Sequence, residues 1–333
     1  MSQRKTVILD HDGGVDDLVA LALLLANPER IKVIGAIVTD ADCLIDYAFD
    51  TSGKLMCLMH LQESMELFPI GRSSFKGVNP FPWEWRCTAS DMNCLPSINH
   101  PSVLELWAKE RPKREGLVGE QLLADLVMNS PEKVTICVTG PLSNVAWCVT
   151  RYGRAFCDKV EACVVMGGAV DVKGNVFIEG RTDGTAEWNI FWDPPAARVV
   201  LTNPDLRSIL FSLDSTNYVP IVPKMIQRYG AQNEYVLSQF VGSAWSGCLH
   251  VGLIRPEDGY YAWDVLTAAY IVDPSIAEIE SVPLDVVVEK NPSEGRTIRS
   301  EKSPGNTWIA KNPIAHKFDD LVVLSMRKCP MKH

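Results

Sequence analysis

Six apolar runs, mostly of β-branched residues, recur along the chain: TVIL (6–9), VIGAIV (33–38), KVTICV (133–138), ACVVMG (162–167), SILFSL (208–213) and LDVVVE (284–289). Helical patterns follow the first three, in the stretches from about Asp16, GKLMCLMHL (53–61) and LSNVAWCVTRY (142–152). This alternation predicts an α/β fold, a mostly parallel central sheet with helices on both faces. Because ligands of such sheets bind beyond the carboxyl ends of the strands, functional residues are expected directly after each run.

The chain shows no internal repeat and no linker rich in Gly, Ser and Pro that would divide it. We therefore expect one domain over residues 1–333. Residues 71–117 contain NPFPWEWRC and few periodic apolar residues, which predicts a long excursion from the sheet. Because loops of that length are usually functional or mobile, residues 71–117 are a candidate active-site loop, and residues 248–262 are a second.

The net charge of -9 argues against a nucleic acid as the main partner, because that affinity comes from clustered Lys and Arg. No stretch approaches the roughly 18 apolar residues of a membrane span, so no membrane partner is expected. The ten cysteines are scattered singly without a CxxC pair, which favours neither a zinc site nor a disulfide framework. We expect reduced cysteines and a cytoplasmic protein with a small-molecule substrate.

Four aspartates crowd into the stretch VILDHDGGVDDLVALALLLA (7–26). Asp10 and Asp12 end the first predicted strand, and Asp16 and Asp17 lie in the first turn of the next helix, where the helix dipole favours anions. Capping explains one or two of them, but crowded carboxylates repel and raise each other's pKa unless a cation intervenes. The stretch therefore predicts a divalent metal site, and its oxygen ligands favour Ca²⁺ or Mg²⁺ over zinc.

Three classes of metal-binding protein compete for this stretch. An EF-hand loop counted from Asp10 would need Gly and Glu where Val15 and Leu21 stand, so that class is excluded. A phosphatase of the haloacid dehalogenase type fits LDHDGG literally, with Asp10 as nucleophile and Asp12 as acid. It remains the alternative, although such an enzyme does not need the adjacent Asp16 and Asp17 here.

The third class is the inosine-uridine nucleoside hydrolase family, whose signature DxDPGxDDxxA this stretch resembles, with glycine for proline at position 13. The matched residues are Asp10, Asp12, Gly14, Asp16, Asp17 and Ala20. Later blocks resemble the family in order: TDADC (39–43), TGPLSN (139–144), MGGAVDVKGN (166–175), TDGTAEWN (182–189) and GYYAWD (259–264). The chain is most similar to the purine-preferring branch, the inosine-adenosine-guanosine nucleoside hydrolases of trypanosomes.

The resemblance implies a single α/β domain, usually a homodimer, with a bound Ca²⁺. Its ligands would be Asp10, Asp12, Asp17, the Thr139 carbonyl and Asp264. Asp12 would be the base that takes a proton from the metal-bound water. The expected substrate-binding residues around the ribose are Gly14, Asp16, Asn79, Met166, Asn175, Glu187 and Asn189.

The resemblance also distinguishes branches by how the base leaves. Several nonspecific or pyrimidine-capable relatives carry His immediately before the late Asp ligand, whereas this chain has Trp263 there. Trp85 and Trp263 would stack on a purine and raise the proton affinity of its N7, which Asp42 would meet. His250, Arg255 and Tyr260 belong to a segment expected to close over the base.

The leading hypothesis is therefore a Ca²⁺-dependent hydrolase that splits the N-glycosidic bond of inosine, adenosine and guanosine into base and ribose, for purine salvage. The absence of a P-loop or basic cluster in the sequence fits a neutral nucleoside. A third, non-catalytic interpretation is a nucleoside- or sugar-binding protein. It would require one of the metal or water-activating acids to be missing, and all are present.

Overall fold

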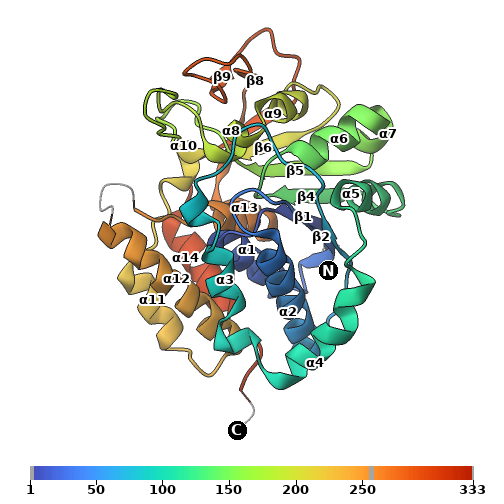
Figure 1. The fold of residues 1–333 in the computed structure, drawn as a ribbon, viewed down its shortest axis with the longest axis vertical. Helices are drawn as coiled ribbons and strands as arrows, with labels where there is room; N and C mark the ends of the chain where they lie inside the picture. The colour runs from blue at the N-terminus through green and yellow to red at the C-terminus, as the bar shows by residue number, and fades with distance from the viewer. Residues whose placement is uncertain (1–3, 255–258, 332–333) are drawn as a thin grey trace.

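The computed structural model describes residues 4–254 and 259–331, without the side chains of residues 250–254. Its main sheet has the strand order β3-β2-β1-β4-β5-β6-β10-β7, in which every pairing is parallel except that of β10 with β7 (Figure 1). The strands are β1 Lys5–His11, β2 Ile31–Val38, β3 Ile70–Arg72, β4 Val134–Val138, β5 Val160–Met166, β6 Ser208–Phe211, β7 Glu278–Ser281 and β10 Thr307–Lys311. The predicted mostly parallel sheet is confirmed.

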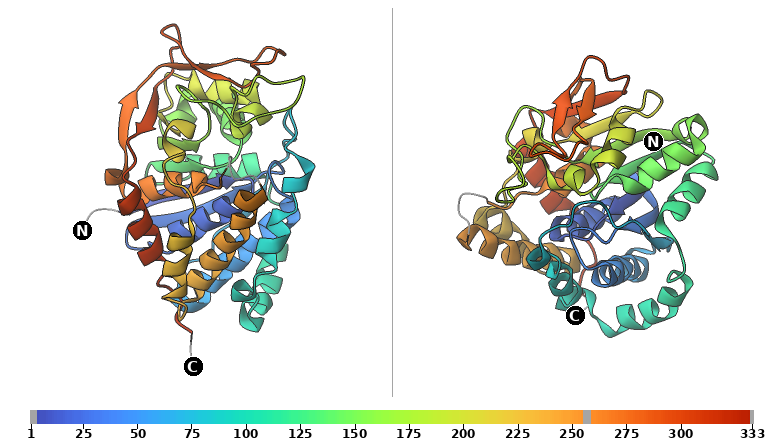
Figure 2. Two further views of the ribbon diagram at one scale, coloured as in Figure 1. Left: turned by 90° about the vertical axis from the view of Figure 1, so that its left-hand side faces the viewer. Right: turned by 45° about the horizontal axis from the view of Figure 1, so that its top comes forward.

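Helices cover both faces of this sheet, as predicted (Figures 1 and 2). The core on one face includes α1 Val15–Leu25, α2 Ile45–Glu63, α12 Val236–Ile254, α13 Trp263–Val272 and α14 Ala315–Ser325. The core on the other includes α5 Gly119–Met128, α6 Ser143–Tyr152 and α9 Pro194–Leu201. Successive side chains of β1 point alternately into the two cores, since Val7 and Leu9 belong to the first and Ile8 belongs to the second.

The shorter helices lie in the connections. They are α3 Thr88–Asn93, α4 Pro101–Glu110, α7 Arg154–Cys157, α8 Trp188–Trp192, α10 Leu213–Thr216 and α11 Pro223–Gly230. Residues 71–117 therefore contain α3 and α4 and are less irregular than the sequence indicated, because their apolar positions are spaced for helices of only two to three turns. No helix of the described residues is long and apolar enough to cross a membrane.

The run LDVVVE does not join the main sheet, contrary to the sequence-based prediction. Its strand β8 (Leu284–Val286) pairs antiparallel with β9 (Thr297–Arg299) in a separate two-stranded sheet, seen at the top of Figure 1. Leu284 and Val286 are buried, but Asp285 between them is half-buried and forms an ion pair with Arg198. This alternation is typical of a strand with one solvent-exposed face, whereas central parallel strands are apolar on both faces.

The strand order changes direction at β1, which lies between β2 and β4. Asp10 near the end of β1 pairs in register with Val138, the last residue of β4. Such a switch point leaves a crevice at the carboxyl ends of the strands, where the connecting loops diverge. The residues that follow β1 and β4 therefore meet where α/β sheets bind ligands.

Candidate active site

The turn between β1 and α1 brings its acidic residues back over the end of the strand. Gly13 has φ +86°, and a Cβ there would come within 2.2 Å of the Ala48 side chain. The ring of proline fixes φ near −65°, so this conformation excludes the proline of the resembled signature. A side chain at position 14 would displace the acidic residues, because its Cβ would lie 2.9 Å from carboxylate oxygens of both Asp17 and Asp42.

Capping accounts for part of the acidic stretch, as the sequence indicated. The Gly14 backbone N–H donates to Asp17 Oδ2 at 2.7 Å, and the Thr139 hydroxyl donates to Asp17 Oδ1. Asp17 thereby closes the N-terminus of α1 and is bound to the residue that follows β4. Asp12 has a different contact, since its Oδ2 accepts the Asp42 backbone N–H at 3.1 Å.

Asp16, Asp17 and Asp264 form a buried cluster at the meeting of α1 and α13. One carboxylate oxygen from each of the three lies within 4.8 Å of the others. Asp16 Oδ2 also accepts the Asp264 backbone N–H at 3.4 Å, and its Oδ1 accepts the Tyr260 hydroxyl at 3.1 Å. The sequence placed Asp17 and Asp264 at the metal and Asp16 at the ribose, and the structure brings all three together.

The electrostatics of this cluster oppose full ionisation. Burial, and then the charge of Asp16, raises the pKa of Asp17 to about 8. Burial, and then the charges of neighbouring carboxylates, raises the pKa of Asp12 and Asp264 well above the usual range. The pKa of Asp42 rises to about 7, first by burial and then by the charge of Asp16. Among the described residues, no Lys or Arg forms an ion pair with these four carboxylates.

Asp10 adds a sixth carboxylate, and one of its oxygens has no hydrogen-bond partner among the described residues. Its Oδ1 accepts the Asn144 side-chain amide at 2.8 Å, while its buried Oδ2 has no hydrogen-bond partner among the described residues. Burial raises the pKa of Asp10 to about 8, although the Asn144 hydrogen bond lowers it. A buried acceptor without a partner is uncommon in folded proteins, and a bound ion or water molecule would supply the partner.

These residues fit a hard divalent cation. The donors are carboxylate oxygens, the ligand type that Ca²⁺ and Mg²⁺ prefer, and a cation there would lower the cost of gathering buried negative charge. The Thr139 carbonyl, expected as a ligand, accepts the Asn189 side-chain amide at 2.9 Å in this structure. The identity of the ion and the roles of the individual ligands stay predictions.

The residues expected around the ribose follow β5 and precede α8. Glu187 caps α8, because its carboxylate accepts the backbone N–H groups of Gly168, Asn189 and Ile190. The Asn189 amide lies 3.4 Å from the sulfur of Met166, the last residue of β5. Glu187, Asn189 and Met166 therefore lie together at one end of β5, and their contacts with the ribose stay a prediction.

Asn175 reaches the same region from the loop after β5. Its backbone N–H pairs with the Ala186 carbonyl at 2.9 Å, which ties it to the residue before Glu187. The Oδ1 of Asn175 is buried without a hydrogen-bond partner among the described residues. It is the second unpartnered acceptor among the predicted site residues, after Asp10 Oδ2.

Asn79 differs from the other predicted substrate-binding residues. Its buried amide donates to the Phe191 carbonyl at 2.7 Å and to Glu294 at 3.2 Å, and its Oδ1 accepts Arg181 and Lys290. These contacts already occupy both ends of the amide. Asn79 thus links its own segment to three others, around residues 181, 191 and 290–294. Its predicted contact with substrate stays a prediction.

Trp85 is half-buried in a 3-10 turn, η1 (Trp83–Trp85), within an aromatic cluster. Its ring lies edge-on at 5.3 Å from Trp188 and 6.4 Å from Phe81. Arg86 anchors this turn to the end of β2 by an ion pair with Asp40. Phe81 stands in the same motif, FPWEW (81–85), but no stacking role was predicted for it from the sequence.

Trp263 begins α13 and belongs to a separate small cluster with Met166, Ala169 and Leu213. Its ring packs edge-on against Tyr260 at 4.9 Å, and its buried Nε1 has no hydrogen-bond partner among the described residues. Trp263 thus lies between Met166, a predicted ribose contact, and Asp264 of the carboxylate cluster. Its stacking role stays a prediction.

Two predicted residues of the second candidate loop cannot be placed. Arg255 and the side chain of His250 lie outside the described residues. The backbone of residues 248–254 is the end of α12, so part of this candidate loop is helical. The assignment of residues 71–117 and 248–262 as active-site loops stays a prediction.

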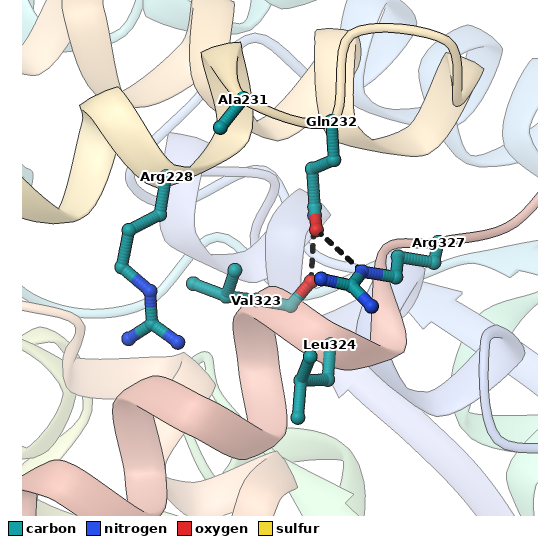
Figure 3. Close-up of a pocket in the computed structure, with 6 residues that line it drawn as sticks. All are labelled: Arg228, Ala231, Gln232, Val323, Leu324 and Arg327. Carbon is teal, nitrogen blue, oxygen red and sulfur yellow. Dashed lines mark hydrogen bonds between the residues drawn. The ribbon is translucent and has the colours of Figure 1, made fainter.

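A shallow cavity of about 180 Å³ lies elsewhere, between α11 and α14 (Figure 3). Its lining residues are Arg228, Ala231, Gln232, Val323, Leu324 and Arg327. Gln232 already donates to the Val323 carbonyl at 2.7 Å and accepts Arg327 at 2.9 Å. None of the predicted site residues lines this cavity, and its polar groups stabilise the packing of the two helices.

The sequence reasoning missed the polar residues that surround Asp10. Asn144, Thr39 and Ser73 are buried, and the Asn144 side chain is hydrogen-bonded to both Thr39 and Ser73. Thr39 and Ser73 each follow a strand of the sheet, and Asn144 stands in the first turn of the helix after β4. The expectation that functional residues follow strands could have found them.

Comparisons with known proteins agree with this geometry. Residues 7–320 match the family model described as inosine-uridine preferring nucleoside hydrolase. The inosine-uridine preferring nucleoside hydrolase of Leishmania major is 25% identical, over 97% of this chain and 98% of that protein. The pyrimidine-specific ribonucleoside hydrolase RihA of Shewanella oneidensis is 24% identical, over 96% of this chain and 95% of that protein.

A solved structure shows the same architecture over nearly the whole length. The inosine-uridine preferring nucleoside hydrolase from Bacillus anthracis aligns with a TM-score of 0.81 and 28% identity, covering 97% of this chain and 99% of that chain. The two sequence relatives carry names with different base preferences. Base preference must therefore be argued from the residues of this chain.

Proposed function

The chain belongs to the inosine-uridine preferring nucleoside hydrolase family, and from that premise we propose that it cleaves purine ribonucleosides to free base and ribose. The observation that carries the chemistry is the buried carboxylate cluster of Asp16, Asp17 and Asp264 at the switch point of the sheet. Buried carboxylates this close together call for a cation, and the family's reaction calls for an activated water.

We propose Ca²⁺ as the cation, with Asp10, Asp12, Asp17, the Thr139 carbonyl and Asp264 as its ligands. When bound, the ion would supply Lewis acidity that makes a water molecule easier to deprotonate. Asp12 then accepts the proton of the attacking water. The Asp42 backbone N–H, 3.1 Å from Asp12 Oδ2, supports this role because it fixes the orientation of the carboxylate.

The sugar is held by groups that favour positive charge on the ribose. Cleavage of an N-glycosidic bond develops oxocarbenium character, which carboxylates and amide oxygens stabilise. Asp16 and Glu187 supply negative charge, and the unpartnered Oδ1 of Asn175 supplies an acceptor for a ribose hydroxyl. Asn189 and Met166 lie against this region and complete the binding surface.

The purine preference rests on the two indoles and on Asp42. Trp85 and Trp263 stack on the departing base, and stacking on a ring that gains electron density favours protonation at N7. Burial and then the charge of Asp16 raise the pKa of Asp42, which favours a protonated carboxyl group that donates a hydrogen bond to N7. A pyrimidine offers a smaller ring and no N7.

The first experiment measures ribose release from inosine and uridine and phosphate release from a phosphomonoester, all without added phosphate. We expect ribose from both nucleosides, with kcat/KM for inosine far above that for uridine. A higher value for uridine would overturn the purine preference alone. Phosphate release without ribose release would overturn the hydrolase and favour the dehalogenase-type phosphatase.

The second experiment removes the metal and the proposed base. Chelation should abolish ribose release, and Ca²⁺ should restore it better than Mg²⁺. Asp12→Asn should lose activity, while Asp171→Asn serves as the matched control, because Asp171 is exposed and pairs with Arg299. Full activity after exhaustive chelation would contradict the cation, and full activity of Asp12→Asn would contradict the base.

We further propose a homodimer that acts in the cytoplasm in purine salvage. The ten cysteines support a reducing compartment, since all are free and eight are buried. Analytical ultracentrifugation would measure the oligomeric state, and a sedimentation coefficient for a 36.9 kDa particle would contradict the dimer.

A further inference from the structure

We propose that Asn144 is a positioning residue for the cation site, whose amide holds the Asp10 carboxylate with one oxygen left free to ligate. The inference rests on the proposed function, because it assumes that a divalent cation occupies the carboxylate cluster. Asn144 itself touches neither the cation nor the substrate in this proposal. It acts through Asp10.

The Asn144 amide is held at both of its ends. Its Nδ2 donates to Asp10 Oδ1 at 2.8 Å and to Thr39 Oγ1 at 3.0 Å, and its Oδ1 accepts the Ser73 hydroxyl at 2.8 Å. All four residues are buried, so water does not compete for these hydrogen bonds. The amide is therefore fixed in orientation, with its NH₂ group toward Asp10.

The partners of Asn144 come from three adjacent strands. Asp10 lies in β1, Thr39 follows β2 and Ser73 follows β3, while Asn144 stands in the first turn of α6 after β4. One side chain thus ties together the carboxyl ends of the strands on one side of the switch point. This arrangement fixes the Asp10 carboxylate relative to the sheet, because the hydrogen bonds restrict rotation of its side chain.

The consequence for Asp10 follows from its second oxygen. Asp10 Oδ2 is buried and has no hydrogen-bond partner among the described residues. We assign this oxygen to the cation, which would supply the missing partner. Without Asn144, the carboxyl group would be free to rotate, and Oδ1 would lose its donor as well. Partners that orient metal ligands typically contribute about 10- to 100-fold in metal affinity.

Ser143 offers a matched control for this inference. It precedes Asn144 in the same helical turn, is also buried, and donates its hydroxyl to Asp193 Oδ2 at 2.6 Å, away from Asp10. A residue that merely stabilised the start of α6 would affect the cation no more than Ser143 does. The discriminating readout is therefore cation affinity, with stability measured alongside.

The experiment titrates Ca²⁺ into the metal-depleted full chain by calorimetry, for wild type, Asn144→Ala, Ser73→Ala and Ser143→Ala. We expect the dissociation constant to rise about 10- to 100-fold for Asn144→Ala. It should rise less for Ser73→Ala, which removes only the donor to the Asn144 carbonyl oxygen, and stay near wild type for Ser143→Ala. Thermal unfolding of the same metal-depleted samples reports any general loss of structure.

Several outcomes would overturn the inference. One is an unchanged dissociation constant for Asn144→Ala, and another is an equal loss for Asn144→Ala and Ser143→Ala. If Asn144→Ala does not fold, Ser73→Ala carries the test, and wild-type affinity in that variant refutes the positioning role. Failure of wild type to bind any divalent cation would instead refute the proposed function, which distinguishes the two failures.

Discussion

Asp10→Asn should change how the stability of the metal-depleted protein depends on pH. Burial raises the pKa of Asp10 to about 8 in the folded protein, against an ordinary value of 3.8. Between these two values the folded state keeps a proton that the unfolded state has released, so the wild type loses stability as pH rises. One such group contributes about 1.4 kcal/mol per pH unit.

The size of the change in the free energy of unfolding follows from the pH range between the two pKa values of Asp10. From pH 5 to pH 7 the Asp10 contribution amounts to a loss of about 2.5 kcal/mol, which the Asp10→Asn variant does not suffer, because its isosteric amide does not titrate. Asp17 and Asp42 titrate in both proteins and largely cancel in the comparison. The variant should therefore gain about 2.5 kcal/mol relative to wild type between pH 5 and pH 7.

Urea unfolding in the presence of a chelator, at pH 5, 6, 7 and 8, measures this difference. Saturating Ca²⁺ should reverse the order, because binding displaces the Asp10 proton in the wild type and the variant lacks a charged ligand. Parallel pH profiles for the two proteins without metal would refute the reasoning. So would a variant that becomes less stable relative to wild type as pH rises.

Three further predictions follow from the same geometry. Asp12→Ala should lower kcat for inosine by about 10² to 10⁴-fold, and steady-state assays that show a smaller loss in a folded variant would contradict its role as base. Trp263→Ala should lower kcat/KM for inosine about 10-fold more than for uridine, and an equal loss for both would remove stacking as the reason. Gly77→Ala should lower the urea midpoint by an amount corresponding to about 1–3 kcal/mol, because φ is +65° and the new Cβ would lie 2.3 Å from Trp192; an unchanged midpoint would contradict this.

Local patterns predicted much of the fold and several features of the site. The run TVIL and the acidic stretch after it placed Asp10 at the end of a strand and Asp17 at a helix N-terminus, where Asp17 caps the helix. Both features have short-range causes, strand alternation and the unpaired N–H groups of a first helical turn. They can be read from a few consecutive residues.

Local patterns could not predict contacts between residues that are far apart in the sequence. Asp264 is 248 residues away from Asp16 along the chain, yet the two share a hydrogen bond. The resemblance to a known family named Asp264 as a ligand, but it did not indicate that Asp16 would join the same cluster. Spacing along the chain does not encode which helices pack together.

The sequence by itself determined the class of fold and the edge of the sheet where chemistry is expected, because hydrophobic periodicity and turn residues act locally. Only the tertiary structure decided which side chains are left with unused polar atoms. Asn79 has both ends of its amide occupied, whereas Asp10 and Asn175 each keep a buried oxygen without a partner among the described residues. Hydrogen-bond satisfaction depends on every neighbour that folding brings together, and for that physical reason it cannot be read from one segment.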